Sequence, residues 1–193
     1  MRSLSFTFVG LFSLNLYAQR TMPIPQMVEN ECMSCHISVM NAPMMAGQDK
    51  EFLEFELFNF RDYVRDHEIM NQVMESFTDQ EVKEIASYIS SLSLCYAQAQ
   101  VDAHPEADVK KGEQIFSASC FNCHKKDISG IGPVIHGQKT GYLEDAIKSF
   151  QSTWYEPRPS RINMRKHTDM LSEQDIKDVA AYLNEQKLCE ENK

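Results

Sequence analysis

One pentapeptide pattern, Cys-x-x-Cys-His, occurs twice in the chain, at residues 32–36 and 120–124. Residues three and four apart share one face of a helix, so both cysteines of a copy can reach one edge of a porphyrin and form thioethers with its vinyl groups. The His that follows can place its imidazole under the iron. This pattern is the attachment signal of c-type haem. It predicts two covalently attached haem c groups, with Cys32, Cys35, Cys120 and Cys123 binding haem and His36 and His124 as the proximal ligands of iron.

Two other kinds of site use Cys-x-x-Cys. A zinc site needs four ligands close together, and a redox dithiol is expected in a thioredoxin-like βαβ pattern. Neither explains why a His directly follows both cysteine pairs. The two motifs therefore favour haem.

The second half of the chain repeats the first well beyond these motifs. The segment 43–48 (Pro-Met-Met-Ala-Gly-Gln) matches 133–138 (Pro-Val-Ile-His-Gly-Gln) at an offset of 90, and 77–82 matches 171–176 at an offset of 94. Such self-similarity indicates two copies of one structural unit. The predicted division is a signal peptide at 1–18, a first haem domain at 19–97, a linker at 98–103 and a second haem domain at 104–193.

The secondary structure is predicted to be helices and loops, because no stretch alternates as a strand would. Residues 108–119 form a candidate helix that leads into the second motif. Thr78 and Ser172 are good helix N-caps, and each has an acidic residue three positions later. Apolar residues at helical spacing follow each cap. The predicted fold class is all-α.

A haem iron with a proximal His needs a second axial ligand or keeps an open site, and Met is the usual choice in electron transfer. Met70 lies seven residues before Phe77, and Met164 lies seven residues before Leu171, so the two occupy equivalent places in the repeat. We predict both as the sixth iron ligands, in loops ahead of the last helix of each domain. An alternative is a packing role, since the chain has 11 Met.

The chain has four other histidines. His67 and His167 lie three residues from the predicted methionine ligands but on opposite sides of them, so a bis-His haem lacks support from the repeat. His104 and His136 are expected at the surface or in loops.

The N-terminus has the pattern of a secretory signal: Arg2, an apolar run, and Ala18 before Gln19. We expect export to the periplasm, where c-type haem is attached. An uncleaved N-terminus would instead associate the protein with a membrane. No later stretch is apolar enough to cross a bilayer.

The chain has 19 basic and 28 acidic side chains, a net charge of −9. This balance argues against a nucleic-acid partner. Residues 19–98 hold 5 basic and 13 acidic side chains, and residues 99–193 hold 13 and 15, giving −8 and −2. The molecule is therefore predicted to be electrostatically polar from end to end.

These features together resemble the dihaem class I cytochromes c of the c-four type. The matching parts are the two motifs, the Pro-to-Gly-Gln loops, the segment 60–65, Met70 and Met164, and the closing helices that end Ala-x-Tyr. The resemblance implies two tandem cytochrome c folds related by a pseudo-twofold, which shuttle single electrons in the periplasm, often towards a terminal oxidase. A membrane dehydrogenase is a further candidate partner.

The resemblance leaves two alternatives open. One is a dihaem enzyme of the peroxidase or thiosulfate-oxidising type, which needs an open or displaceable ligand at one iron. The other is an electron-accepting subunit of a larger dehydrogenase. The chain also departs from the family, because Ile37 and Lys125 follow the motif histidines where Gly is usual. The first domain lacks a counterpart of the Gly112–Phe116 pair and is expected to have a stunted first helix.

Cys95 and Cys189 correspond in the repeat, each seven residues after a Tyr. Unpaired thiols are uncommon in an oxidising compartment. A disulfide between them and two isolated thiols are both compatible with the sequence.

Overall fold

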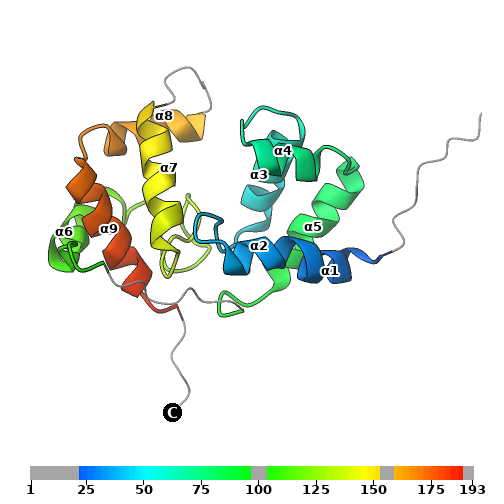
Figure 1. Cartoon of the computed structure of the whole chain (residues 1–193), viewed down its shortest axis with the longest axis horizontal. Helices are drawn as coiled ribbons and strands as arrows, with labels where there is room; N and C mark the ends of the chain where they lie inside the picture. Colours follow the sequence, from blue (N-terminus) through cyan, green and yellow to red (C-terminus); the bar gives the residue numbers. More distant parts are fainter. Residues whose placement is uncertain (1–21, 97–103, 153–158, 189–193) are drawn as a thin grey trace, which may run out of the picture.

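The computed structural model describes residues 22–96, 104–152 and 159–188, with side chains from 162 onward in the last range. These residues contain helices and no strand, which confirms the all-α prediction. They form two helical groups that lie side by side (Figure 1). The first group precedes residue 97 and the second follows residue 103.

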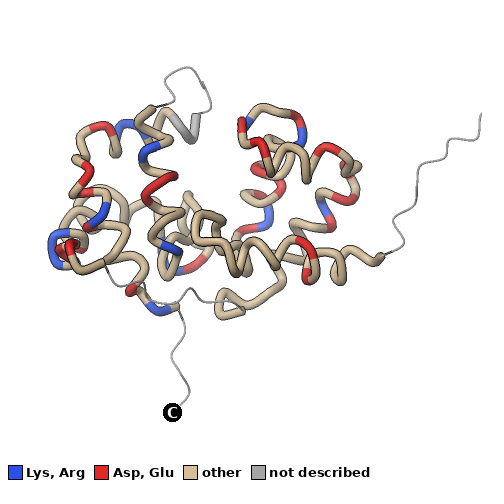
Figure 2. Tube along the Cα trace, viewed as in Figure 1, with Lys and Arg blue, Asp and Glu red and all other residues tan. Residues whose placement is uncertain are grey.

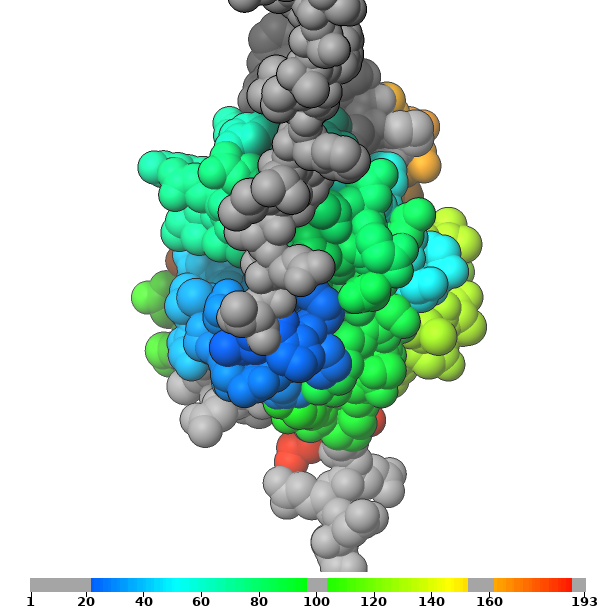
Figure 3. All heavy atoms as spheres, turned by 90° about the vertical axis from the view of Figure 1, so that its right-hand side faces the viewer, coloured from blue at the N-terminus to red at the C-terminus, as the bar shows by residue number. Residues whose placement is uncertain are grey.

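The first group surrounds a core that is rich in methionine. Met27, Met33, Met45 and Met74 are buried there together with aliphatic residues and Phe60. Helices α1 and α5 pack against each other, and Figure 3 shows them next to one another on the outer face of this group. The helices are α1 (Ile24–Met27), α2 (Met33–Ser38), α3 (Lys50–Arg61), α4 (Glu68–Met74) and α5 (Asp79–Ser91).

The second group is built on a crossing of its first and last helices. A Cβ on Gly112 would clash with the carbonyl oxygen of Asp178, so only glycine allows this approach of the two backbones. Phe116 is buried one turn later and packs on the ring of Tyr182, with 5.6 Å between ring centroids. The helices are α6 (Val109–Ser119), α7 (Thr140–Ser152), α8 (Pro159–Thr168) and α9 (Glu173–Glu185).

The caps predicted from the sequence are present. Thr78 and Glu81 form a reciprocal capping box at the start of α5, and Ser172 and Asp175 form the same box at the start of α9. Each box satisfies backbone donors that a helix start would otherwise leave unpaired. The candidate helix at 108–119 is α6, with Asp108 as its N-cap.

The first helical run differs between the two groups. In the first group α1 is followed by a π-helical turn, Val28–Cys32, and then by α2. Only eight helical residues precede Cys32, whereas the eleven of α6 precede Cys120. Met27 and Val28 are buried on this short run in place of a glycine–phenylalanine pair.

The two groups are joined by a reciprocal pair of glutamines. The side-chain amide of Gln48 donates to the carbonyl oxygen of Val134 (2.6 Å) and accepts from its N–H (3.0 Å). The amide of Gln138 donates to the carbonyl oxygen of Met44 (3.0 Å) and accepts from its N–H (2.8 Å). All four residues are related by the offset of 90, so the contact repeats about a pseudo-twofold.

Charge follows the division seen in the sequence. Figure 2 shows mostly acidic residues over α3 and α5, and a mixture of both signs over the second group. Within the described ranges, no helix has the length and apolar character that a bilayer crossing requires. The predicted signal peptide (1–18) and linker (98–103) lie outside the described residues, so the domain limits remain predictions.

Candidate haem sites

Each motif histidine is buried and oriented by an equivalent proline. Nδ1 of His36 donates to the carbonyl oxygen of Pro43 (2.6 Å), and Nδ1 of His124 donates to the carbonyl oxygen of Pro133 (2.8 Å). A carbonyl only accepts, so the proton of each ring is fixed on Nδ1 and Nε2 is left as the ligand atom. A hydrogen bond of this kind orients metal-ligating histidines in general. Both sites therefore have the same support for a proximal ligand.

Burial also favours the neutral form of both rings, which is the form that ligates a metal. Burial lowers the pKa of His36, against the opposing effect of the Pro43 hydrogen bond, and the positive charge of Lys139 lowers it further. Burial lowers the pKa of His124 in the same way. A Cβ on Gly132 would lie 2.7 Å from Cε1 of His124, so the loop can pack on this ring only with glycine there.

The motif cysteines are available for thioethers. Of the described cysteines, Cys32, Cys35, Cys120 and Cys123 are outside any disulfide. Burial raises the pKa of Cys120 to about 11, and the neighbouring Cys123 adds to the effect. A neutral thioether suits this environment better than a thiolate does. The residues present therefore fit a covalently bound haem c in each group. Within the described ranges, no three His, Cys, Asp or Glu side chains gather as a zinc site would require.

The predicted methionine ligands occupy matching places, but they are in helices. Met70 lies in the first turn of α4 and packs against the first core. Met164 lies half-buried within α8. The prediction that these methionines are in loops was therefore wrong. The sequence signal was weak because α4 has only seven residues and its N-cap is His67, an uncommon capping residue. Their role as iron ligands stays a prediction.

His67 and His167 are the alternative candidates for the sixth-ligand positions. Nδ1 of His67 accepts from the backbone N–H of Met70 (3.3 Å), and its ring packs edge-on against Phe60. The charge of His67 contributes, after burial and other causes, to lowering the pKa of His36, and His167 acts similarly on His124. Both imidazoles thus lie within electrostatic range of the proximal ligands.

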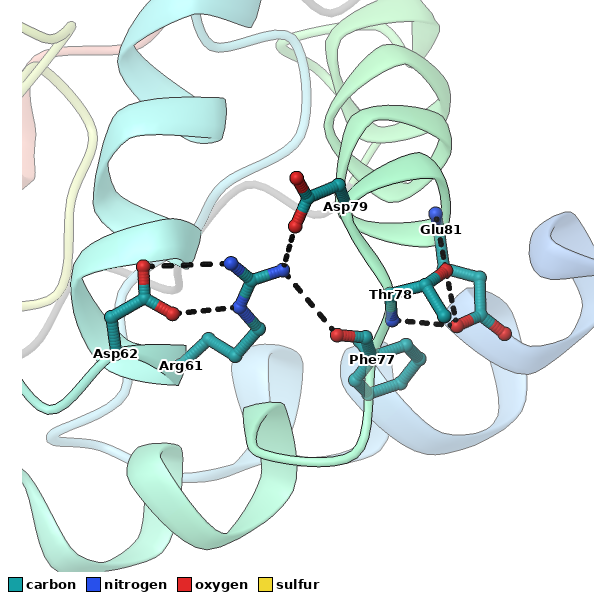
Figure 4. Close-up of polar contacts among 6 residues, drawn as sticks. All are labelled: Arg61, Asp62, Phe77, Thr78, Asp79 and Glu81. Atoms are coloured by element: carbon teal, nitrogen blue, oxygen red, sulfur yellow. Dashed lines mark hydrogen bonds and ion pairs between the residues drawn. The ribbon is translucent and has the colours of Figure 1, made fainter. Parts of the chain in front are cut away.

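Arg61 links the end of α3 to the start of α5. Its guanidinium bonds the carboxylates of Asp62 (2.8 Å) and Asp79 (2.5 Å) and reaches the carbonyl oxygen of Phe77 (3.5 Å), as Figure 4 shows beside the Thr78–Glu81 capping box. This arrangement holds the segment that carries Met70 between two fixed helices.

Cys95 is disulfide-bonded, but Cys189 lies outside the described residues, so their pairing stays a prediction.

His136 lies in a loop as predicted but not at the surface: it is 4% exposed, and its Nδ1 has no hydrogen-bond partner. Its burial was hidden from the sequence because the equivalent residue is the small Ala46.

Comparison with known proteins identifies the family of this chain. The family model described as cytochrome c matches residues 109–187. A cytochrome c6-like protein of Nostoc is 38% identical over 78 residues, which cover 39% of this chain and 68% of that protein. The chain belongs to the cytochrome c family. It therefore carries covalently bound haem c, whose iron exchanges single electrons.

Longer matches span both halves of this cytochrome. Cytochrome c-552 of Acidithiobacillus ferridurans is 27% identical over 184 residues, covering 84% of this chain and 76% of that protein. The crystal structure of reduced cytochrome c4 from Pseudomonas stutzeri matches with a TM-score of 0.72 and 21% identity, covering 85% of this chain and 97% of that one. This likeness supports a fold of two tandem cytochrome c domains. A protein named thiosulfate dehydrogenase electron acceptor, from Thiomonas intermedia, is 24% identical over 137 residues, 62% of either chain.

Proposed function

We propose that this cytochrome is a periplasmic dihaem carrier that passes single electrons between two redox proteins. The observation that carries the proposal is the duplicated proximal geometry: the imidazole of His36 donates to the carbonyl oxygen of Pro43, and that of His124 donates to the equivalent Pro133. Two haem sites with the same proximal arrangement in one chain suit electron storage and relay. The bound haem supplies the ferric–ferrous couple, and the protein holds the ligands, excludes water and presents a surface for docking.

The role of the chain at each site is positional. The carbonyl oxygens of Pro43 and Pro133 hold the proximal imidazoles in one tautomer and one orientation. Met70 and Met164 are proposed as sixth ligands, because they sit at equivalent positions on short helices before the capped last helix. With both positions filled by thioether sulfur, no substrate would bind at iron, and the protein would be a carrier rather than an enzyme.

A second candidate is supported by the Thiomonas relative, whose name describes an electron acceptor for a dehydrogenase. In this version the chain is the electron-accepting partner of a periplasmic dehydrogenase, and the terminal oxidase lies further along. The dihaem enzyme is a third version, which needs an open or displaceable ligand at one iron.

The test uses the purified haem-loaded protein. A carrier with two filled sites is expected to reduce and reoxidise rapidly with a small redox protein, to bind no carbon monoxide at either ferrous iron, and to turn over neither peroxide nor thiosulfate. Rapid binding of carbon monoxide to one haem together with turnover of either compound would replace the carrier with an enzyme. Stable co-purification with a dehydrogenase whose electrons reduce the cytochrome would favour the second candidate.

A further inference from the structure

Lys139 of the second group inserts its side chain into the first group. Its Nζ donates to the carbonyl oxygen of His36 (2.8 Å) and to that of Val39 (2.7 Å). The residue is only 5% exposed. Lysine is rarely buried unless it is paired, and here two carbonyl oxygens accept from it. These carbonyls belong to the last turn of α2 and its C-cap, where the helix dipole favours a cation. A buried positive charge is thus held on the backbone of the first proximal ligand.

The contact breaks the symmetry of the interface. Gln48 and Gln138 correspond and make equivalent bonds, but the residues that follow them are Asp49 and Lys139. Asp49 turns back to its own group, where its carboxylate caps α3 by accepting from the N–H of Phe52 (2.8 Å). The offset of 90 therefore places a lysine and an aspartate at matching positions. Of this pair, only the lysine reaches across to a haem ligand.

The charge has a direct consequence for an iron bound by His36. Reduction adds one negative charge at the haem, so a fixed positive charge nearby stabilises the ferrous form more than the ferric form. Burial strengthens this effect because water screens the charge less.

We propose that Lys139 is a tuning and positioning residue for the first haem: its buried ammonium, held on the carbonyl oxygens of His36 and Val39, raises the reduction potential of that haem. The second domain thereby sets the potential of the first. This inference rests on the proposed function, because it needs a redox-active haem at His36. It goes beyond that function because it names an electrostatic cause for a difference between the reduction potentials of the two haems.

The experiment is a reductive titration of the full-length, haem-loaded protein followed by proton NMR. Ferric haem methyl signals, assigned through contacts with the residues of each motif, report the two haems separately. Lys139→Gln removes the charge but keeps an N–H donor, and Lys139→Met also removes the donor. Both variants are expected to shift the equilibrium of the first haem towards the ferric form by roughly tenfold, which is about 59 mV for one electron. The second haem should stay unchanged, and Lys139→Arg should restore most of the potential.

A control variant separates the buried charge from charge in general. Lys148→Gln removes an exposed charge from α7. It should not move the first potential by more than a small fraction of the Lys139 effect. Thermal unfolding identifies a variant that is merely misfolded, and Lys139→Gln is the milder replacement for that case.

A first-haem potential that stays at the wild-type value in both Lys139→Gln and Lys139→Met would overturn the inference, as would an equal shift at both haems. A protein that carries two haems yet shows such results contradicts the tuning role alone. A protein without haem at the first motif contradicts the proposed function itself.

Discussion

Gln48 and Gln138 make the same pair of hydrogen bonds in opposite directions, each to one backbone peptide group of the other domain. Both side chains are buried, and so is the peptide of Val134. The pair ties together the two loops that also supply Pro43 and Pro133 to the proximal histidines. The same two loops therefore form the interface between the domains and orient the haem ligands.

Replacing Gln48 with alanine should leave the buried N–H and carbonyl oxygen of Val134 without their partners, and replacing Gln138 should do the same to the half-buried peptide group of Met44. Each replacement should lower the free energy of unfolding by about 1–3 kcal/mol, and the Gln48 replacement should cost more because the Val134 peptide is more deeply buried. Urea unfolding followed by circular dichroism measures this, with the exposed Gln72→Ala on α4 as control. If both variants were as stable as that control, the interface would not be maintained in solution.

Met70→Ala and Met164→Ala should each abolish sulfur ligation at one haem only. The ferric spectrum of either variant should lose about half of its sulfur-to-iron band, and the potential of the affected haem should fall, since Met ligation raises it. His67→Gln and His167→Gln serve as matched variants of the competing ligands. A full band in the methionine variants, together with a changed spectrum in either histidine variant, would reassign the sixth ligand.

Gly112→Ala should disrupt the crossing of α6 and α9, because the added methyl would clash with the carbonyl oxygen of Asp178. Overpacking of this kind costs roughly 1–3 kcal/mol. Ser117→Ala, an exposed change on the same helix, should be close to neutral. Thermal unfolding monitored at the second haem tests both, and equal melting temperatures would mean that the crossing is looser than described.

His136 gives the second domain a defined response to acid. Burial lowers its pKa to about 4, and the charge of Lys126 adds to this, so the folded state holds the ring neutral while an unfolded chain protonates it near pH 6.5. Its contribution to stability is complete above pH 6.5 and is lost progressively as the pH falls towards 4. His136→Ala, which installs the residue found at the equivalent Ala46, should remove this part of the acid dependence. Urea unfolding at pH 7, 5.5 and 4.5 gives the dependence of the free energy of unfolding on pH for the wild type and the variant. The same dependence in both proteins would show that His136 does not titrate in this way.

Local features of this chain could be predicted from its sequence. The motifs, the repeat and the capping boxes each depend on residues within a few positions of one another, and short-range geometry decides them. The helices around Met70 and Met164 were missed because they are short and because the first of them begins after His67, an uncommon capping residue.

Contacts between the domains could not be predicted from the sequence. The repeat identified Gln48 and Gln138 as equivalent, but it gave no sign that each bonds the other domain. Lys139 looked like one basic residue among many, since its burial depends on where residues a hundred positions away are placed. The roles of Pro43 and Pro133 were also hidden, although their conspicuous match in the repeat was a signal that could have been followed.

We expect one chain to carry two haems that each exchange one electron. Coulometric reduction of the pure protein, with its haem content fixed by intact mass, tests this directly. The expected result is a mass with two covalent haems, an uptake of two electrons per chain in one-electron steps, and full recovery on reoxidation. A mass with fewer than two haems after expression with a working maturation system, or an uptake of one electron or none, would contradict it.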